Sequence, residues 1–185
     1  KFEVVNHKWT DVSENRYGIA LLNDCKYGIS GERDENDGVD IRLSLHKSGT
    51  HPDVTGDAGV HELTYSLLPH EGAFSVPAVT SEAYLMNIKP VAVYGKSDIA
   101  VIATVGEDNI ILETVKPAED DCGSCVLRLY EAERARTSCA VALAGAKRAY
   151  LTNMLEDKLS ELEIKDGKIT IDFKPFEIKT ILVER

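Results

Sequence analysis

Short apolar runs separated by turn signals recur along the whole chain, and they limit its fold more than any other feature. We count nine or ten such runs, and at most one or two short helical segments. Ile41–Leu45 alternates apolar and polar residues with a period of two, as a half-buried strand does. Many short strands with few helices between them are typical of antiparallel sheets packed in two layers. The sequence therefore predicts an all-β fold, an antiparallel β-sandwich.

Several expected strands have sharp boundaries. Tyr17–Leu22 is apolar throughout and predicts a buried strand. Glu62–Leu68 predicts another strand, which we expect to end at Pro69 because proline cannot donate a backbone hydrogen bond. Ile99–Val105 and Ile110–Val115 flank a short polar turn and predict a β-hairpin.

The best helix candidate in the first half of the chain is Ser81–Asn87. Ser81 is a residue type that caps helix N-termini. Tyr84, Leu85 and Ile88 recur at helical spacing, so we expect them to share the apolar face.

Length and charge narrow the classes of protein. A chain of 185 residues without an internal repeat or a convincing linker is expected to form a single domain over residues 1–185. The 31 acidic residues outnumber the 21 basic ones, giving a net charge of -10, which argues against a nucleic-acid partner. The longest apolar run, Ile99–Val105, is too short to cross a bilayer, so we expect no membrane partner.

The four cysteines indicate free thiols in a cytoplasmic protein, because a chain of this length without a secretory segment does not need disulfides. Cys122 and Cys125 have the spacing of a redox dithiol or half a zinc site. A redox pair normally opens a helix, and here a strand follows. A structural zinc needs two more ligands, which no familiar spacing supplies. We therefore expect neither a working dithiol nor a metal at this pair.

A dense polar turn follows the apolar strand that begins at Tyr17. Asn23, Asp24, Lys26 and Tyr27 arrive together, with Gly28 behind them. Such a turn can present chemistry at the rim of a scaffold. It can equally be a turn that its own side chains stabilise, since Asn and Asp bond to nearby backbone. The residues alone leave both interpretations open.

Three histidines, His51, His61 and His70, lie in and after a loop with carboxylates nearby. Histidine and carboxylate are suitable ligands for zinc or a related cation. Their spacings are wide and match no metal motif, which favours scattered polar residues over a metal site. Acidic pairs are too numerous here to indicate the two carboxylates of a glycosidase.

Eight blocks of this sequence match members of one known protein family, and they occur in the same order along the chain. These blocks resemble the carboxyl-terminal region of glycoside hydrolase family 38 α-mannosidases, with the cytosolic and bacterial enzymes as the nearest type. The blocks run from end to end of the chain and cover residues 2–14, 17–28, 41–45, 61–72, 112–116, 126–132, 153–156 and 175–178.

The resemblance implies a fold, a function and a missing partner. The fold would be a β-sandwich of the galactose-mutarotase-like supersandwich type, as the C-terminal fragment of a larger retaining enzyme. That enzyme would hydrolyse terminal α-D-mannosyl residues in oligosaccharides, in the cytoplasm and in mannose metabolism. An upstream catalytic domain would hold a divalent metal, usually zinc, and would supply the Asp nucleophile and the acid/base carboxylate. None of those motifs occurs here, so no catalytic or metal residue is assigned in this chain, and the fragment alone is expected to be inactive.

Three roles therefore stay open for the chain itself. As an accessory domain it would pack on the catalytic domain, and Asn23, Asp24, Lys26 and Tyr27 would lie at the substrate rim or at the domain interface. It could instead be a free-standing carbohydrate-binding module, or a structural domain that holds a homo-oligomer together. The chain starts at Lys1 without an initiator Met, which leads us to expect an excised domain or a processed product.

Overall fold

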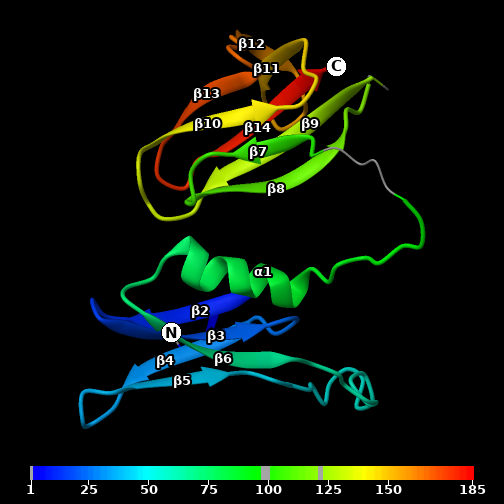
Figure 1. The fold of residues 1–185 in the computed structure, drawn as a ribbon. Coiled ribbons are helices and arrows are strands. Elements are labelled where there is room, and N and C mark those ends of the chain that lie inside the picture. The colour runs from blue at the N-terminus through cyan, green and yellow to red at the C-terminus, as the bar shows by residue number, and fades with distance from the viewer. Residues whose placement is uncertain (1, 97–100, 121–122) are drawn as a thin grey trace. The chain divides into compact units, whose positions relative to one another are not determined.

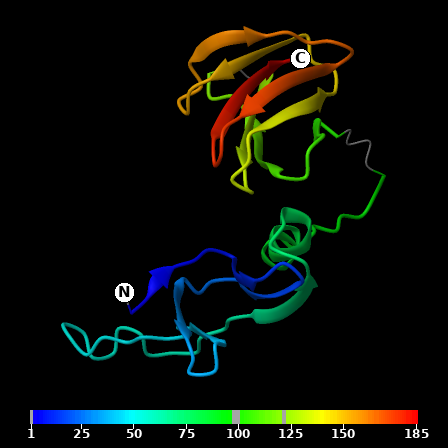
Figure 2. The same cartoon turned by 90° about the vertical axis from the view of Figure 1, so that its left-hand side faces the viewer.

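The computed structural model describes residues 2–96, 101–120 and 123–185. The chain divides into two compact units, Lys1–Ala92 (unit 1) and Val93–Arg185 (unit 2). Both units are built from antiparallel strands (Figures 1 and 2), and the all-β, antiparallel prediction is confirmed. Whether the two units act as one domain, as the sequence led us to expect, stays a prediction. No helix among the described residues is long and apolar enough to span a membrane.

Unit 1 contains two three-stranded sheets and one short helix. The sheet orders are β1-β4-β5 and β2-β3-β6. Its elements are β1 (Val4–Val5), β2 (Trp9–Ser13), β3 (Tyr17–Asn23), β4 (Gly28–Arg33), β5 (Val39–Leu43), β6 (Tyr65–Glu71), the π-helical segment η1 (Val76–Thr80) and α1 (Ser81–Asn87).

The core of unit 1 lies between α1 and one face of β3. Side chains alternate between the two faces of a strand, so Ala20 and Leu22 of β3 point to the same side. They pack against Val79 and Ala83, which are fully buried, and the small Ala83 lets α1 come close to the sheet. The helix covers this sheet face in Figure 1. Trp9 of β2 stacks on Phe74 at the edge of this core, with 4.7 Å between the ring centroids.

Unit 2 is a two-layer sandwich. One sheet has the order β13-β10-β7, and the other has the order β12-β11-β14-β9-β8. Its strands are β7 (Ala103–Val105), β8 (Ile110–Pro117), β9 (Ser124–Glu131), β10 (Thr137–Leu143), β11 (Arg148–Thr152), β12 (Lys158–Leu162), β13 (Lys168–Phe173) and β14 (Ile178–Glu184).

The two sheets of unit 2 enclose one large apolar core. Leu127 and Leu129 of β9 and Ile181 of β14 are fully buried from one sheet, and Val141 and Ile169 face them from the other. Apolar residues at every second position along β9 and β13 place one face of each strand in this core. Unit 2 therefore covers both of its inward sheet faces with its own strands.

The strand predictions hold in most places, but the hairpin after residue 99 is wrong. β7 pairs with β10, where Val105 is opposite Val141, and β8 pairs with β9. The turn at Gly106 therefore carries the chain from one sheet to the other, because β7 and β8 belong to different sheets. Ala103 and Ile110, on either side of this turn, both belong to the enclosed core. Residues 99 and 100 of the predicted first strand lie outside the described residues.

Strand boundaries in unit 1 also differ from prediction: β5 is Val39–Leu43 where Ile41–Leu45 was expected, and β6 is Tyr65–Glu71 where Glu62–Leu68 was expected. β6 continues through Pro69, which is opposite Ile19 of β3. β6 is at the edge of its sheet, and an edge strand tolerates proline because only one of its sides is paired. The predicted helix Ser81–Asn87 is confirmed as α1. The unpredicted segment η1 precedes it from Val76, where the Ser75 hydroxyl accepts a hydrogen bond from the Ala78 N–H at 3.3 Å.

The predicted apolar face of α1 is wrong as well. Leu85 and Ile88 are 68% and 62% exposed, and the buried side of the helix is formed by Ala83. Because η1 leads directly into α1, Val79 and Ala83 are four residues apart along one continuous helical segment and lie on one face.

Candidate functional site

Asn23, the first residue of the predicted polar turn, is held entirely inside the protein. Its side chain is at the end of β3 and the residue is 1% exposed. The side-chain oxygen accepts a hydrogen bond from the Lys26 N–H at 2.8 Å, and its Nδ2 donates to Asn6 Oδ1 at 3.3 Å. Asn87 of α1 donates to the Asn23 carbonyl at 3.0 Å. Asn23 therefore joins the turn to α1 and to the segment before β2.

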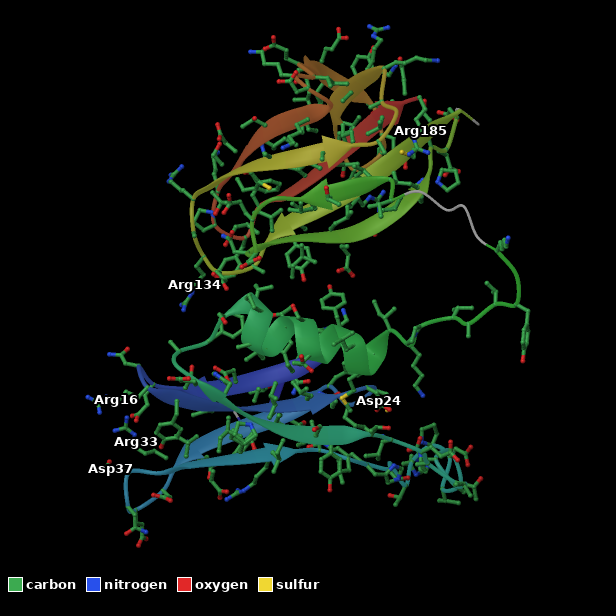
Figure 3. The ribbon with its side chains drawn as sticks, viewed as in Figure 1. Arg16, Asp24, Arg33, Asp37, Arg134 and Arg185 are labelled. Carbon is green, nitrogen blue, oxygen red and sulfur yellow. The ribbon has the colours of Figure 1, made fainter. Side chains whose placement is uncertain are left out.

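Asp24 attaches the end of β3 to the chain just before β6. Both carboxylate oxygens lie 3.0 Å from the Thr64 N–H, and the Asp24 N–H donates to the Thr64 carbonyl at 3.1 Å. The hydrogen bond from the Thr64 backbone, with a second from the Cys25 thiol, lowers the pKa of Asp24. Figure 3 shows Asp24 in this place at the end of the strand.

Lys26 and Tyr27 complete the group, and Tyr27, like Asp24, is exposed. The Lys26 side chain is half-buried and Tyr27 is 52% exposed. The Tyr27 ring lies against His7 with 5.0 Å between centroids, and its carbonyl accepts a hydrogen bond from the Asn6 N–H at 2.8 Å. The structure brings all four predicted residues together at one turn. It gives Asn23 and Asp24 internal partners, and it leaves the Tyr27 ring available for contact.

A buried His–Asp pair in unit 1 was not predicted from the sequence. His70 Nε2 of β6 and Asp11 Oδ1 of β2 lie 2.7 Å apart across β3, and each side chain is only 5% exposed. Gly18 of β3 makes room for them, because a Cβ there would overlap the His70 ring and would lie 2.6 Å from Ser13 Cβ. A glycine in the middle of an apolar strand was the available signal for such a close approach.

Unit 2 contains a second buried polar group centred on Glu131, which is 0% exposed. Its carboxylate accepts hydrogen bonds from Asn109 Nδ2 at 3.0 Å, from the Glu133 N–H at 2.7 Å and from the Phe176 N–H at 2.9 Å. Asn109 also donates to Thr137 Oγ1 at 2.7 Å. One carboxylate thus connects the turns before β8, after β9 and before β14.

The ionised form of Glu131 is favoured in spite of its burial. Burial by itself would raise the pKa of Glu131, but backbone hydrogen bonds from Phe176, Ala135 and Glu133, and one from the Asn109 side chain, outweigh it and lower the pKa. Period two places Glu131 on the inward face with Leu127 and Leu129, so an acidic residue at an inward position was the signal in the sequence. All of these bonds are internal, which gives Glu131 a structural role.

The described histidines and cysteines form no metal centre. His61 lies against His46 and its Nε2 is 2.9 Å from the Asp57 carbonyl, whereas His70 is buried in the sheet. No group of three histidine, cysteine, aspartate or glutamate side chains suited to a metal ion occurs in the part of the chain that the structure describes.

The three described thiols are not activated. Cys25, Cys125 and Cys139 are free, and burial raises the pKa of both Cys125 and Cys139. A raised thiol pKa disfavours the reactive thiolate. Cys122, the other half of the predicted pair, lies outside the described residues.

Two of the surface hollows on the described parts of the separate units bear on function. The larger, of about 540 Å³, is an open depression on unit 2 between Arg136, Lys174 and Glu177. Charges of both signs line it, and Lys179 is paired with Glu177 at 3.7 Å. The smaller, of about 250 Å³, is an apolar groove in unit 1. The buried carboxylates Glu131 and Asp11 are both engaged in internal contacts, which gives them structural roles.

Comparison with protein families identifies the class to which this fold belongs. Residues 1–55 match the glycosyl hydrolases family 38 C-terminal domain, and residues 109–181 match the glycosyl hydrolases family 38 C-terminal beta sandwich domain. The two matches lie in different units and together cover more than half of the chain. The chain therefore belongs to glycosyl hydrolase family 38, as part of its C-terminal region.

The curated relatives are similar over almost the whole chain. Alpha-mannosidase 2C1 of Homo sapiens is 38% identical over 99% of this chain, which covers 18% of that protein. Alpha-mannosidase G of Dictyostelium discoideum is 37% identical over 97% of this chain and 17% of its own length. The alpha-mannosidase of Saccharomyces cerevisiae is 33% identical over 96% of this chain and 18% of its own length. The chain thus spans less than a fifth of these relatives.

Solved structures show the same fold. A glycosyl hydrolase family 38 protein from Enterococcus faecalis aligns with 98% of this chain and 22% of its own, with a TM-score of 0.73 and 21% identity. An alpha-mannosidase from the same species aligns with 98% of this chain and 21% of its own, with a TM-score of 0.72 and 22% identity. The resemblance drawn from the sequence blocks is confirmed.

Proposed function

We propose that this chain is an accessory C-terminal region of an α-mannosidase that hydrolyses terminal α-D-mannosyl residues in oligosaccharides. One observation supports this most strongly: relatives named alpha-mannosidase match 96–99% of the chain at 33–38% identity. The chemistry would belong to an upstream catalytic domain of the same polypeptide, on which this region packs. The free thiols of Cys25, Cys125 and Cys139 support a cytosolic location.

The metal of such an enzyme has no place among the described residues of this chain. The described residues bring no three suitable ligands together, so they do not fit a zinc site. We assign the divalent metal, with the nucleophile and the acid/base carboxylate, to the catalytic domain. The contribution of this chain is then to fold around, and to hold in place, a surface of that domain.

The polar turn after β3 is our candidate for the contact with that domain or with the substrate rim. Asn23 and Asp24 fix the turn through buried and backbone hydrogen bonds. Tyr27 is then exposed on a rigid base, with the half-buried Lys26 beside it, and an exposed tyrosine on a fixed turn suits contact with a sugar or with another domain. A Tyr27→Ala substitution in the whole polypeptide should lower kcat/KM without lowering the melting temperature.

The proposed function is tested by measuring hydrolysis of a chromogenic α-mannoside. The whole polypeptide should be active, and the 185-residue chain alone should be inactive. Activity of this chain alone, or a folded whole polypeptide without activity, would contradict the proposal. Calorimetric titration of the chain with mannosides separates the alternative: heat of binding would support a free-standing carbohydrate-binding module.

A further inference from the structure

The face of β3 opposite α1 opens into an apolar groove. Ala20 and Leu22 point toward α1, so the alternate residues Ile19 and Leu21 point the other way. Further apolar side chains line the groove from the neighbouring sheet and strand, among them Ile41 and Leu43 of β5 and Tyr65 and Leu67 of β6.

The lining side chains on β6 are exposed to a degree that a finished sandwich would not show, although Leu21 at the floor of the groove is buried. Leu67 is 66% exposed and Tyr65 is 55% exposed, although both lie within β6. No charged residue is among the lining side chains of this groove. A contiguous apolar surface of this kind marks a contact with another segment or molecule.

Two sheet edges border the groove. Within the described residues, β5 pairs only with β4, and β6 pairs only with β3. Each strand therefore presents one row of backbone groups that its own sheet does not use. Figure 1 shows β5 and β6 running next to each other along this side of unit 1. Apolar pockets beside a free strand edge are suited to an extended segment, which can use both side-chain and backbone contacts.

We propose that an extended apolar segment of the same polypeptide, amino-terminal to this chain, occupies the groove between β5 and β6. This rests on the proposed function, because it requires the longer enzyme. The matched models are both C-terminal, and the chain spans 18% of the human relative, so most of such a polypeptide lies outside this chain.

The position of β1 favours a tethered segment over a separate partner. β1 pairs with β4, the strand next to β5, so chain that leads into Phe2 arrives at the sheet that forms the groove. Adjacent strands are about 5 Å apart, which places β1 two strand spacings from the edge at β5. A tethered segment binds at a high effective concentration. A second copy is disfavoured, because each chain carries a net charge of -10 and the copies repel.

Hydrogen exchange of the β6 backbone tests the proposal. Exchange is measured over Tyr65–Glu71 in the 185-residue chain and in the whole polypeptide. Occupation of the groove should slow exchange in the whole polypeptide about tenfold or more, because covered edge groups exchange only after local opening. Exchange over Lys158–Leu162, an exposed edge strand of unit 2, should be equal in both forms.

A matched pair of variants sharpens the test. Leu67 and Leu159 are 66% and 63% exposed, and each lies in an edge strand. In the whole polypeptide, Leu67→Asp should abolish the slowing over β6, because it places a charge in the covered groove. Leu159→Asp should leave the slowing intact. Equal effects of the two substitutions on hydrogen exchange over β6 would overturn the proposal.

Two other results would overturn it. Equal exchange over β6 in both forms would mean that no upstream segment covers the groove. Slow exchange over β6 in the 185-residue chain itself would mean that a segment of this chain covers the groove. If that slowing depended on protein concentration, a second copy would be the occupant.

Hydrolysis of an α-mannoside is measured on the same whole polypeptide, so that the proposed function and the proposed occupant of the groove are tested separately. Slow β6 exchange without hydrolysis would contradict the proposed function and support the groove. Hydrolysis without slow exchange would contradict the groove alone.

Discussion

Unit 1 and unit 2 are nearly equal in length, but they bury their apolar residues in different ways. Among the described residues, unit 2 encloses a core cluster of thirteen buried residues between two of its own sheets. Unit 1 encloses four, between one sheet and α1, and leaves an apolar groove open on the other face of that sheet. Similar strand content thus gives a closed sandwich in one unit and an unfinished one in the other.

The strand pattern of a unit therefore does not determine whether both faces of its sheets are covered. Apolar burial is the main favourable contribution to folding, and small domains have little of it to spare. Unit 2 meets this need by itself. Unit 1 has exposed leucine and tyrosine side chains within a regular strand, and in our account the rest of the polypeptide covers them.

We expect the largest loss of folding stability from a cavity in the closed core of unit 2. Leu129→Ala, at a residue that is 0% exposed, should destabilise unit 2 by about 2–5 kcal/mol. The matched change Leu67→Ala removes the same atoms from an exposed position and should cost less than about 0.5 kcal/mol in this chain. Urea unfolding followed by hydrogen exchange in each unit measures both. Equal losses would show that the groove of unit 1 is not open.

The second prediction concerns the buried carboxylate of unit 2. Glu131→Gln keeps the shape of the side chain but removes the charge that accepts four hydrogen bonds, and should cost about 1–3 kcal/mol. Asp172→Asn, at an exposed position of β13, is the control and should have little effect.

The same carboxylate predicts a pH dependence. The pKa of Glu131 is lower in the folded chain than the ordinary value of 4.5, so the folded state favours the ionised form. This contribution is complete above the unfolded pKa and is lost as the pH falls through the folded pKa. The stability difference between the wild-type chain and Glu131→Gln should therefore shrink below about pH 4.5. A difference that stays constant down to pH 3 would contradict the assignment of the ionised form.

The third prediction tests how tightly unit 1 packs where it is closed. Gly18→Ala should destabilise unit 1 by about 1–3 kcal/mol, because the new methyl group would overlap the buried His70 ring and Ser13. Gly31→Ala in β4 is the matched control, since nothing lies within 4 Å of its Cβ position, and it should be neutral or stabilising by about 0.5 kcal/mol. Thermal unfolding of the two variants measures the contrast, and equal melting temperatures would contradict it.

The smallest expected effect is at the turn after β3. Asp24→Ala removes the carboxylate that accepts from the Thr64 N–H and should cost about 0.5–1.5 kcal/mol. Lys26→Ala should cost less, because only the Lys26 backbone is held by Asn23. Hydrogen exchange at the first residues of β6 would report the loss, and unchanged exchange in Asp24→Ala would remove its role in fixing the turn.

The sequence was informative about strands and less so about their partners. Tyr17–Leu22 was predicted within a residue because its pattern is local. The pairing of β7 with β10 is not local, since Val105 and Val141 meet across 36 positions of sequence, and nothing near either residue encodes the other. β12 was missed because an exposed edge strand of mixed polarity has no apolar face to give it a period.

The candidate site shows the same limit. The cluster of Asn23, Asp24, Lys26 and Tyr27 was visible as sequence neighbours. Their partners were not, because Asn87 and Thr64 come from distant parts of the chain. The pattern of types could indicate a polar turn, but only the three-dimensional contacts separate the side chains that fix the turn from those that face outward.

Calorimetric unfolding tests whether the rest of the polypeptide covers the open face of unit 1, whereas unit 2 closes its core by itself. The 185-residue chain should show two transitions, with Gly18→Ala lowering the first and Leu129→Ala lowering the second. In the whole polypeptide only the transition of unit 1 should move to higher temperature. A single transition in the isolated chain, lowered equally by both variants, would contradict the account.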